Sequence, residues 1–407
     1  MRNNIPKGWL MKRFGEVFEF LSTLSLSRSE LTYEKTIDEI YNIHYGDIHS
    51  KFEFQVLDLT KAKELPKIIN NKGNNYTFLK EGDLIIADAS EDYAGVASCI
   101  ELKNVNNKKI TAGLHTFAAR DNSNLTVNGF RAYILKNDWV FNEVKKLATG
   151  SKVYGVSKTN IQNLKILLPP LREQEKIAEI LSKWDELIAT QSQLIQAKQK
   201  QKKALMQKLL SGKLRFPGFT DKWEEKTLGS VAEVIMGQSP DSNSYNNLQN
   251  GLPLIQGNAD IKNRVSCPKL FTSNPTKITK KGDLLMTVRA PVGSIGKSSL
   301  QACIGRGVCA IRPNNVNSDF LYYSLIDYED KWKSLEQGST FSSVNSNDIK
   351  SLKIMTPNNN KEQQKIASVL SACEEEIETL KTELQSLQNQ KKGLMQQLLT
   401  GKIKVNW

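Results

Sequence analysis

Two short stretches of the chain contain residue types that could do chemistry. PVGSIGKSS (residues 291–299) ends like a phosphate-binding loop, in which the backbone amides of a glycine-rich turn hold a phosphate. That loop needs a glycine five residues before its second glycine, but Pro291 stands there and has no amide hydrogen. HYGDIH (residues 44–49) spaces two histidines five apart, which is wrong for one helix face, and no cysteine or glutamate lies nearby to complete a metal site. Neither stretch predicts a catalytic or metal centre.

Two other signatures of catalysis are missing from the sequence. No Gly-x-Ser-x-Gly occurs, so there is no nucleophile elbow. A methyltransferase acting on an amine would need an Asn/Asp-Pro-Pro-aromatic loop, and the single Pro-Pro lies in LPPL (168–171), where it is typical of the start of a helix. We therefore expect a binding protein that is not itself an enzyme and has no metal or cofactor of its own.

Polar loops with glycines are the best candidates for a binding surface. They separate strand-like runs such as DLIIADA and DLLMTVR, and they are rich in Asn, Gln, Arg and Ser, which pair with base edges in the major groove of DNA. For any single residue the alternative is an ordinary solvated loop. The candidate DNA-contacting residues are Lys72, Asn74, Asn75, Arg120, Lys152 and Tyr154 in the first half and Gln238, Gln256, Asn258, Arg264, Arg289 and Arg306 in the second half.

The composition favours a polyanionic partner. The 407 residues carry a formal net charge of +13, and the pI is near 9.3; such a field attracts nucleic acid or an anionic membrane. No apolar run approaches the ~20 residues that span a bilayer, and the N-terminus has no signal-peptide pattern. Five cysteines without a CxxC pair are typical of a reducing compartment. We expect a cytoplasmic protein.

The positions of these loops are set by an internal repeat. Residues 171–216 align without a gap with residues 360–405 and are identical at roughly half of the positions. Upstream, EGDLIIADA (81–89) matches KGDLLMTVR (281–289), and Trp9 matches Trp223. Between these landmarks the halves diverge. Each half is therefore predicted to be a variable globular module followed by a matched helix.

The matched segments carry heptad repeats, which predict a coiled coil. Each is about five heptads long and free of proline, and glycines at 212 and 401 would end the helices in left-handed caps. We expect the two helices to pair antiparallel, and the alternative is that each packs only on its own module. The predicted seam residues are Ile177, Leu181, Trp184, Ile188, Leu205, Leu209, Ile366, Leu370, Ile377, Leu384, Leu394 and Leu398. Polar residues in the seam, Lys202 and Lys391 among them, would fix register and partner.

Together the two blocks make the chain resemble the specificity subunits of type I restriction–modification systems. The resemblance rests on LREQEKIAEIL…LMQKLLSGKLRFPGF, on KEQQKIASVL…LMQQLLTGKIKV and on the restart FTDKWEEKTLGSVAEV, and it covers essentially the whole chain. It implies a mixed α/β (α+β) fold with two target recognition domains separated by two long antiparallel coiled-coil helices. Its domains would be recognition domain 1 (1–170), a central helix (171–215), recognition domain 2 (216–358) and a C-terminal helix (359–407).

The resemblance also implies a function and partners. Each recognition domain would read one half of a bipartite double-stranded DNA site, and the helices would set the unread spacer. The chain would dock two modification subunits, which bind S-adenosylmethionine and methylate adenine N6, and restriction subunits, which use ATP and Mg²⁺. Two alternatives stay open: a free-standing, repressor-like DNA-binding protein and a structural adaptor that does not bind DNA.

Overall fold

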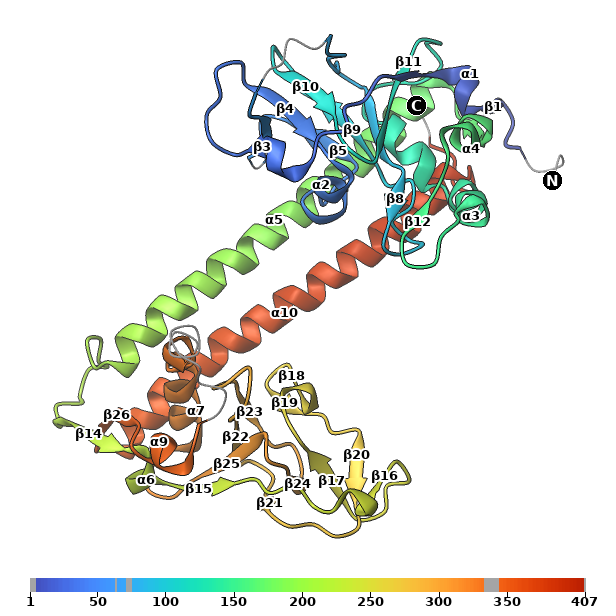
Figure 1. Ribbon diagram of the computed structural model, residues 1–407. Coiled ribbons are helices and arrows are strands. Elements are labelled where there is room, and N and C mark those ends of the chain that lie inside the picture. Colours follow the sequence, from blue (N-terminus) through green and yellow to red (C-terminus); the bar gives the residue numbers. More distant parts are fainter. Residues whose placement is uncertain (1–4, 63, 71–74, 333–343, 406–407) are drawn as a thin grey trace. The chain divides into compact units, whose positions relative to one another are not determined.

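The computed structural model describes residues 5–62, 64–70, 75–332 and 344–405. The chain forms two compact units: unit 1 comprises residues 1–192 and 382–407, and unit 2 comprises residues 193–381. Each unit contains one globular domain and parts of two 40-residue helices, α5 (Leu171–Leu210) and α10 (Asn360–Leu399) (Figure 1). The mixed α/β fold with two domains and two long helices is as predicted.

The domain of unit 1 is built on two main sheets, with strand orders β2-β11-β7-β9-β5 and β10-β4-β6-β3. The pairs β1-β13 and β12-β8 form two small sheets. The strands are β1 (Leu10–Arg13), β2 (Phe18–Leu21), β3 (Leu31–Thr32), β4 (Ile40–Ile43), β5 (Val56–Asp58), β6 (Lys67–Ile68), β7 (Leu84–Ala87), β8 (Ala89–Ser90), β9 (Cys99–Lys103), β10 (Lys109–Ala112), β11 (Thr116–Asp121), β12 (Tyr154–Gly155) and β13 (Lys165–Leu168). The helices are α1 (Phe14–Val17), η1 (Arg28–Glu30), α2 (Tyr45–Ser50), η2 (Arg131–Lys136), α3 (Asp138–Leu147) and α4 (Lys158–Asn163).

The domain of unit 2 repeats this plan with sheets ordered β15-β25-β22-β23-β19-β18 and β16-β20-β17-β24-β21, and with the small sheet β14-β26. The strands are β14 (Trp223–Thr227), β15 (Ala232–Met236), β16 (Tyr245–Asn246), β17 (Leu252–Ile255), β18 (Ile261–Lys262), β19 (Val265–Ser266), β20 (Leu270–Thr272), β21 (Ile278–Thr279), β22 (Leu284–Thr287), β23 (Ile295–Lys297), β24 (Ala302–Ile304), β25 (Val308–Pro313) and β26 (Lys353–Pro357). The helices are α6 (Leu228–Val231), η3 (Ser242–Ser244), η4 (Asn258–Asp260), α7 (Ser318–Asp327) and α9 (Ser346–Lys350).

The sequence landmarks of the repeat occupy matching places in the two domains. The Gly-Asp pairs at 82–83 and 282–283 form the turns before β7 and β22, whose continuous apolar runs are buried throughout. Both glycines have positive φ, and Asp83 and Asp283 accept the backbone N–H groups of Lys80 and Lys280 at 2.7 and 2.8 Å. The stretch around 291–299, which resembled a phosphate loop, contains β23, with Lys297 paired to Asp319 at 2.7 Å.

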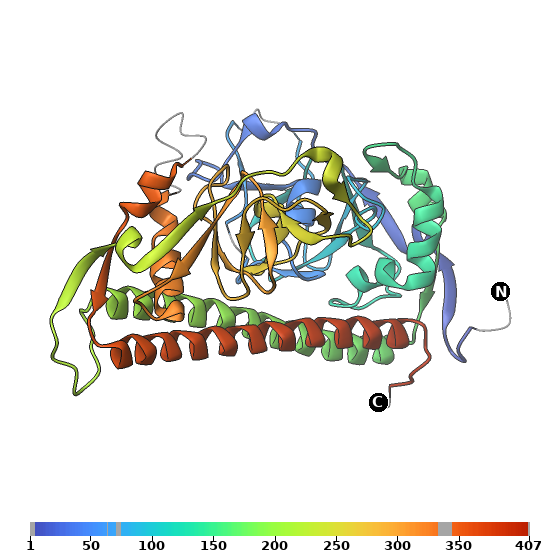
Figure 2. The same ribbon diagram turned by 90° about the horizontal axis from the view of Figure 1, so that it is seen from below.

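Within each unit, α5 and α10 lie side by side and run in opposite directions (Figure 2). In unit 1 Asp185 contacts Lys391, and Gln191 Nε2 donates to Glu383 at 3.1 Å. In unit 2 Lys198 pairs with Glu376 at 2.5 Å and Lys202 with Glu374 at 3.3 Å. Residue numbers therefore rise along one helix as they fall along the other. Antiparallel pairing, expected from the heptads, is confirmed within each unit.

The predicted seam residues lie on the inner side of this pairing. Ile177, Leu181, Ile188, Leu209, Ile366, Leu370, Ile377 and Leu398 are buried, whereas Trp184, Leu205, Leu384 and Leu394 are half-buried. The apolar core of unit 1 includes residues of both helices, and so does that of unit 2. Gly212 and Gly401 have φ of +68° each, which confirms the left-handed caps. In the described part of the chain, no helix is long and apolar enough to cross a membrane.

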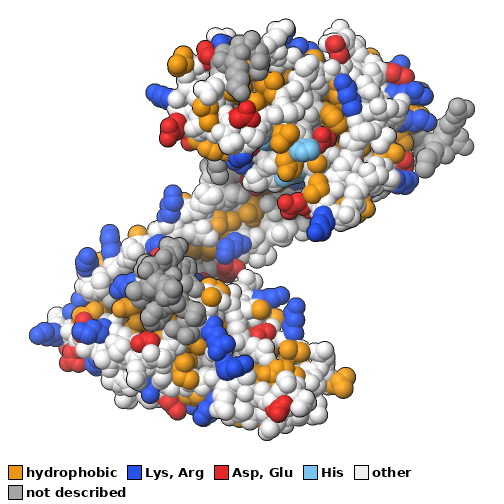
Figure 3. Space-filling model, viewed as in Figure 1, with side chains coloured by type: hydrophobic (Ala, Val, Ile, Leu, Met, Phe, Trp, Pro, Cys, Tyr) orange, Lys and Arg blue, Asp and Glu red, His pale blue; other side chains and the backbone are white. Residues whose placement is uncertain are grey.

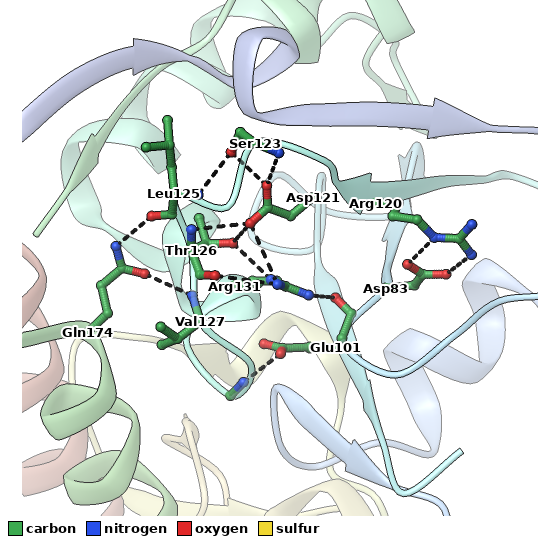
Figure 4. Close-up of polar contacts among 12 residues, drawn as sticks. Asp83, Glu101, Arg120, Asp121, Ser123, Leu125, Thr126, Val127, Arg131 and Gln174 are labelled. Carbon is green, nitrogen blue, oxygen red and sulfur yellow. Dashed lines mark hydrogen bonds and ion pairs between the residues drawn. The ribbon is translucent and has the colours of Figure 1, made fainter. Parts of the chain in front are cut away.

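The repeated phrase LREQEKIAEIL fastens each helix start to its own domain. Gln174 is fully buried; its Nε2 donates to the carbonyls of Leu125 and Pro169 at 2.8 Å, and its Oε1 accepts from Val127 N at 3.1 Å (Figure 4). Gln363 makes the matching contacts, to Pro357 O at 2.8 Å and from Asn317 N at 2.7 Å. Because buried amides need partners for every polar atom, these glutamines fix the angle at which a helix leaves its domain.

A buried carboxyl group lies in the same region of unit 1. Glu101 on β9 accepts the backbone N–H groups of Gly129 and Ala132 at 2.5 and 3.2 Å, next to the Asp121–Thr126–Arg131 network (Figure 4). Burial raises the pKa of Glu101 to about 7, although these hydrogen bonds and Arg131 act in the opposite direction.

This shift predicts a pH-dependent stability of unit 1. A carboxyl group whose folded-state pKa lies above its unfolded value stabilises the fold below the unfolded pKa, and this contribution is lost as the pH rises toward the folded value. As the pH rises from 4.5 to 8, we expect the free energy of unfolding of the native chain to fall by about 2 to 3 kcal/mol relative to that of Glu101→Gln. The variant has no carboxyl group at this position and therefore lacks this pH dependence.

Pulse labelling of the buried thiol of Cys99, corrected for the unfolded-state labelling rate at each pH, measures the opening of β9. The exposed Glu175→Gln is the matched control and should show no such drift. A pH-independent difference for Glu101→Gln would contradict the expectation.

Candidate nucleic-acid interface

One corner of unit 2 brings together four of the candidate DNA-contacting residues. Gln256 follows β17, Asn258 begins η4, Arg289 follows β22, and Arg306 precedes β25. They line a cavity of about 450 Å³ together with Ser239, Ser242 and Tyr245. Residues from four separate segments converge here because the ends of neighbouring strands meet at one edge of the domain. We call this site corner 2.

Backbone contacts hold corner 2 in shape. The carboxylate of Asp260 accepts the N–H groups of Gln256 and Gly257 at 2.7 and 3.3 Å, which fixes the turn after β17. Gly307 must lack a side chain, since a Cβ there would lie 2.2 Å from the carbonyl oxygen of Gln256. Arg306 is anchored through its N–H and Nε, which donate to Ser239 Oγ at 3.2 and 3.3 Å.

The electrostatics of corner 2 are cationic. Arg289 and Arg306 are exposed, and within the described residues neither guanidinium forms an ion pair with a carboxylate. The Asp260 carboxylate is occupied by backbone N–H groups. Outside the lining of corner 2, Lys and Arg side chains also gather on unit 2 around the position of β18 and β19 (Figure 3). A guanidinium held at its base and free at its tip can make the two parallel hydrogen bonds that read guanine O6 and N7 or grip a phosphate.

An equivalent corner exists in unit 1, although its side chains differ. β4 pairs parallel with β10 as β17 pairs with β24, so that His44 occupies the position of Gln256. The repeat extends to the backbone: Gly113 N donates to Ile43 O, and Gly305 N to Ile255 O, both at 2.8 Å. Asp47 accepts the N–H of His44 at 3.0 Å, as Asp260 does for Gln256. We call this site corner 1.

Corner 1 is aromatic and rich in imidazole. Its cavity, about 910 Å³ in volume, is lined by Arg28, His44, Tyr45, His49 and Ser90 among others. The ring of Tyr45 lies 6.0 Å from that of His49 and 5.3 Å from that of His115, in edge-to-face contacts. His49 Nε2 is 2.9 Å from Ala89 O, and His115 Nδ1 is 3.2 Å from Asp88 Oδ1.

Burial lowers the pKa of His44, which keeps this ring neutral near pH 7. The described residues contain no group of His, Cys, Asp and Glu side chains that could hold a metal ion. Imidazole, phenol and hydroxyl groups can donate to or accept from base edges, and corner 1 contains all three.

Two predicted arginines lie in ion pairs with carboxylates. Arg120 donates to Asp83 at 2.9 and 2.6 Å, and Arg312 donates to Asp283 in the same way at 3.1 and 2.8 Å in unit 2. Because this pair recurs in both domains, it favours a scaffold role for Arg120. Arg264 donates to Glu329 at 2.6 and 3.0 Å and to the backbone carbonyl of Ile295 at 3.0 Å. These contacts also favour a structural role, and DNA contact by either residue stays a prediction.

The remaining predicted residues are scattered. Tyr154 pairs with Ser90 of corner 1 across β12 and β8, and its ring lies 3.9 Å from that of Tyr93. Lys152 and Asn75 are exposed in unit 1, and Gln238 is exposed in the segment after β15. Lys72 and Asn74 lie outside the described residues.

The histidines and Tyr45 of corner 1 are candidate residues that the sequence did not indicate as a DNA-contacting set. HYGDIH looked like an unsuccessful metal motif, since spacing along the chain does not show that His115 joins it through β10 and β11. The repeat itself contained the signal. A candidate residue in one half predicts a candidate at the matching position of the other half. His44 directly follows β4 as Gln256 directly follows β17, so His44 is the counterpart of Gln256.

Comparison with known proteins identifies relatives over nearly the full length. The sequence profile of the type I restriction modification DNA specificity domain matches residues 6–198 and 220–389. The specificity subunit assigned to the type I restriction enzyme MjaX of Methanocaldococcus jannaschii is 33% identical, over 98% of this chain and 95% of its own length.

Solved structures share the fold. A chain from a type I R-M system, solved to explain complex assembly and conformational transition, superposes with a TM-score of 0.63 at 23% identity, covering 98% of this chain and 100% of its own. The HsdS subunit from Thermoanaerobacter tengcongensis gives a TM-score of 0.50 at 25% identity, covering 98% of each chain.

Proposed function

The chain belongs to the family of type I restriction–modification specificity subunits, and on that premise we propose that corners 1 and 2 each read one half of a bipartite DNA site. The observation that carries the proposal is the equivalence of the two corners. They occupy the same place on a repeated backbone, and arginine, tyrosine and serine line both. Corner 2 also contains Gln256, Asn258 and a second arginine, whereas corner 1 also contains His44 and His49. A common frame with different polar groups suits two readers of different sequences.

The division of labour within the complex follows from the same premise. The specificity subunit is not the catalyst. We propose that two modification subunits dock on it, bring S-adenosylmethionine and methylate adenine N6, and that restriction subunits bring ATP and Mg²⁺. The net charge of +13 supports a phosphate-binding role, since Lys and Arg contacts to the DNA backbone hold the protein in position while a few base contacts select the sequence.

We further propose that paired α5 and α10 set the length of the unread spacer. Their seam continues into both domain cores, so each domain is fastened to the helices next to it. Two 40-residue helices at 1.5 Å per residue are each about 60 Å long, which is of the order needed to span a site of two half-sites and a spacer.

Sequencing of N6-methyladenine in host DNA, with and without this chain, tests the proposed function. We expect a bipartite methylated motif that disappears when the chain is removed and returns when it is supplied again. An unchanged methylation pattern would contradict the proposal. Tight, specific DNA binding by the chain alone would instead favour a repressor-like protein, and DNA affinity that does not fall with added salt would favour an adaptor.

A further inference from the structure

Each unit contains a cluster of one tyrosine, one carboxylate and one lysine. All three residues are buried in unit 1, whereas in unit 2 the tyrosine is buried and the side chains of the lysine and the carboxylate are 16% and 31% exposed. In unit 1, which holds cluster 1, Tyr133 from η2 donates its O–H to Asp185 of α5 at 2.8 Å, and Lys391 of α10 contacts the same carboxylate. Asp185 and Lys391 are each 9% exposed, and Tyr133 is fully buried. The domain of unit 1, through Tyr133, and α10, through Lys391, therefore both contact the Asp185 carboxylate of α5.

Cluster 2, in unit 2, is the same arrangement with the helices exchanged. Tyr323 from α7 donates to Glu374 of α10 at 2.9 Å, and Lys202 of α5 pairs with that carboxylate at 3.3 Å. Both lysine ammonium groups also lie over the tyrosine ring of their own cluster, at 5.8 Å in cluster 1 and 5.4 Å in cluster 2. Each helix thus carries a carboxylate in its first half and a lysine in its second half.

The spacing of these groups makes only one helix register electrostatically acceptable. A slip of one heptad in one direction places Lys391 opposite Ser192 and Lys202 opposite Lys381. In the other direction the two lysines face Ala178 and Ala367. In both slips the carboxylates of Asp185 and Glu374 lose their lysines and face leucine or isoleucine seam positions. Leaving a charge unpaired is strongly unfavourable where it is buried, as at Asp185, and costs less at the half-buried Glu374.

The apolar seam alone does not discriminate in this way. In the apolar parts of the two seams, leucine and isoleucine recur every three or four residues, so a heptad slip brings many apolar groups opposite apolar groups again. A buried ion pair adds little net stability over an apolar pair of similar size, whereas buried polar groups are best known for fixing register. The clusters are therefore suited to selecting one alignment rather than to strengthening the helix pair.

We propose that clusters 1 and 2 are register locks that restrict the subunit to a single spacer length. The lysine–carboxylate pairs select one alignment of α5 and α10, and Tyr133 and Tyr323 connect each recognition domain to that alignment. The inference rests on the proposed function, because spacer length has meaning only if both domains read DNA. It adds six positioning residues that touch no base.

The test compares the native chain with an unlocked variant in the complex with its modification subunits. The variant combines Asp185→Leu, Lys391→Leu, Lys202→Leu, Glu374→Leu, Tyr133→Phe and Tyr323→Phe. Methylation is sequenced on a plasmid library in which the two half-sites are separated by spacers of every length. We expect the native complex to prefer one spacer by about tenfold or more, and the unlocked complex to accept spacers about three base pairs shorter or longer with less than about threefold discrimination.

A second measurement reads the register without DNA. Cysteines replace Gln191 and Glu383, which contact each other, or Gln191 and Gln390, which would meet only after a heptad slip. A short bifunctional maleimide should join only the first pair in the native background and both pairs in the unlocked background. Because crosslinking requires no methylation, it tests whether the clusters fix the helix register even if the proposed DNA-reading function is wrong.

Two controls separate a lock from general stability. Lys198→Leu with Glu376→Leu removes a more exposed ion pair between the same helices, with side chains 31% and 48% exposed, and should keep the single spacer. Exchanging the charges within both clusters, by Asp185→Lys with Lys391→Asp and Lys202→Glu with Glu374→Lys, should keep it as well. A folded unlocked chain with native spacer preference and native crosslinking would overturn the inference, whereas absence of any bipartite methylation by the native complex would contradict the proposed function instead.

Discussion

Arg289→Ala is expected to relax reading of one half-site while the other half-site is still read normally. Arg289 is exposed at the rim of corner 2 and has no carboxylate partner among the described residues, so its guanidinium is available to a base or a phosphate. A bidentate arginine–guanine contact contributes about 1 to 3 kcal/mol of discrimination, and its loss should reduce selectivity at one base pair by roughly 5- to 150-fold. Sequencing of N6-methyladenine with the reconstituted complex measures the change at each position of the motif.

Matched variants assign the effect to corner 2. Arg306→Ala should act on the same half-site, because Arg306 lines the same cavity. Lys269→Ala removes an exposed positive charge from the same domain outside the cavity, and should leave base selectivity unchanged. His44→Ala or His115→Ala should alter the opposite half-site. An identical motif for Arg289→Ala and the native complex would refute the assignment of Arg289, and a change in both half-sites would refute the separation of the two corners.

The two long helices and the repeated domain plan could be predicted from the sequence because the internal repeat contains the same signals twice. Heptads indicate a coiled coil at any position, and Gly212 and Gly401 indicated where the helices end, as their φ values confirm. The partners of Asp185 and Glu374 were harder to predict. The lysine partners were visible as polar residues in the heptads, but which carboxylate each lysine contacts can be predicted only when the antiparallel register is known. The tyrosine partners come from elements far away in the chain.

The candidate binding residues were less predictable because residue type does not reveal whether a charged side chain is already paired. Arg120, Arg264, Arg289 and Arg306 look alike in sequence, yet the first two are held by Asp83 and Glu329 and the last two are not paired with carboxylates in the described structure. The repeat helps to separate them. The Asp83 that holds Arg120 has a counterpart in Asp283, and this repetition indicates that the ion pair has a structural role. Arg289 and Arg306 instead occupy positions where the two halves differ. Specificity is expected at positions that the repeat does not share.

The second large effect is expected from shortening both helices by one heptad. Deleting residues 189–195 from α5 and 378–384 from α10 removes segments that lie between clusters 1 and 2 in both helices, so both clusters can form again after the deletion. Each helix loses about 10 Å at 1.5 Å per residue, which corresponds to about three base pairs of B-DNA.

If the helix pair sets the spacer, the double deletion should methylate sites whose spacer is about three base pairs shorter and should lose the native site by more than about tenfold. The same half-site sequences should still be read, because corners 1 and 2 are untouched. Deleting only residues 189–195 is the informative control. In that variant Lys202 moves by one heptad relative to Glu374 while Asp185 keeps Lys391, so the two clusters demand different registers and the pairing of α5 with α10 should fail. Methylation of the native spacer by a folded double deletion would show that the distance between the half-sites is set elsewhere than in α5 and α10.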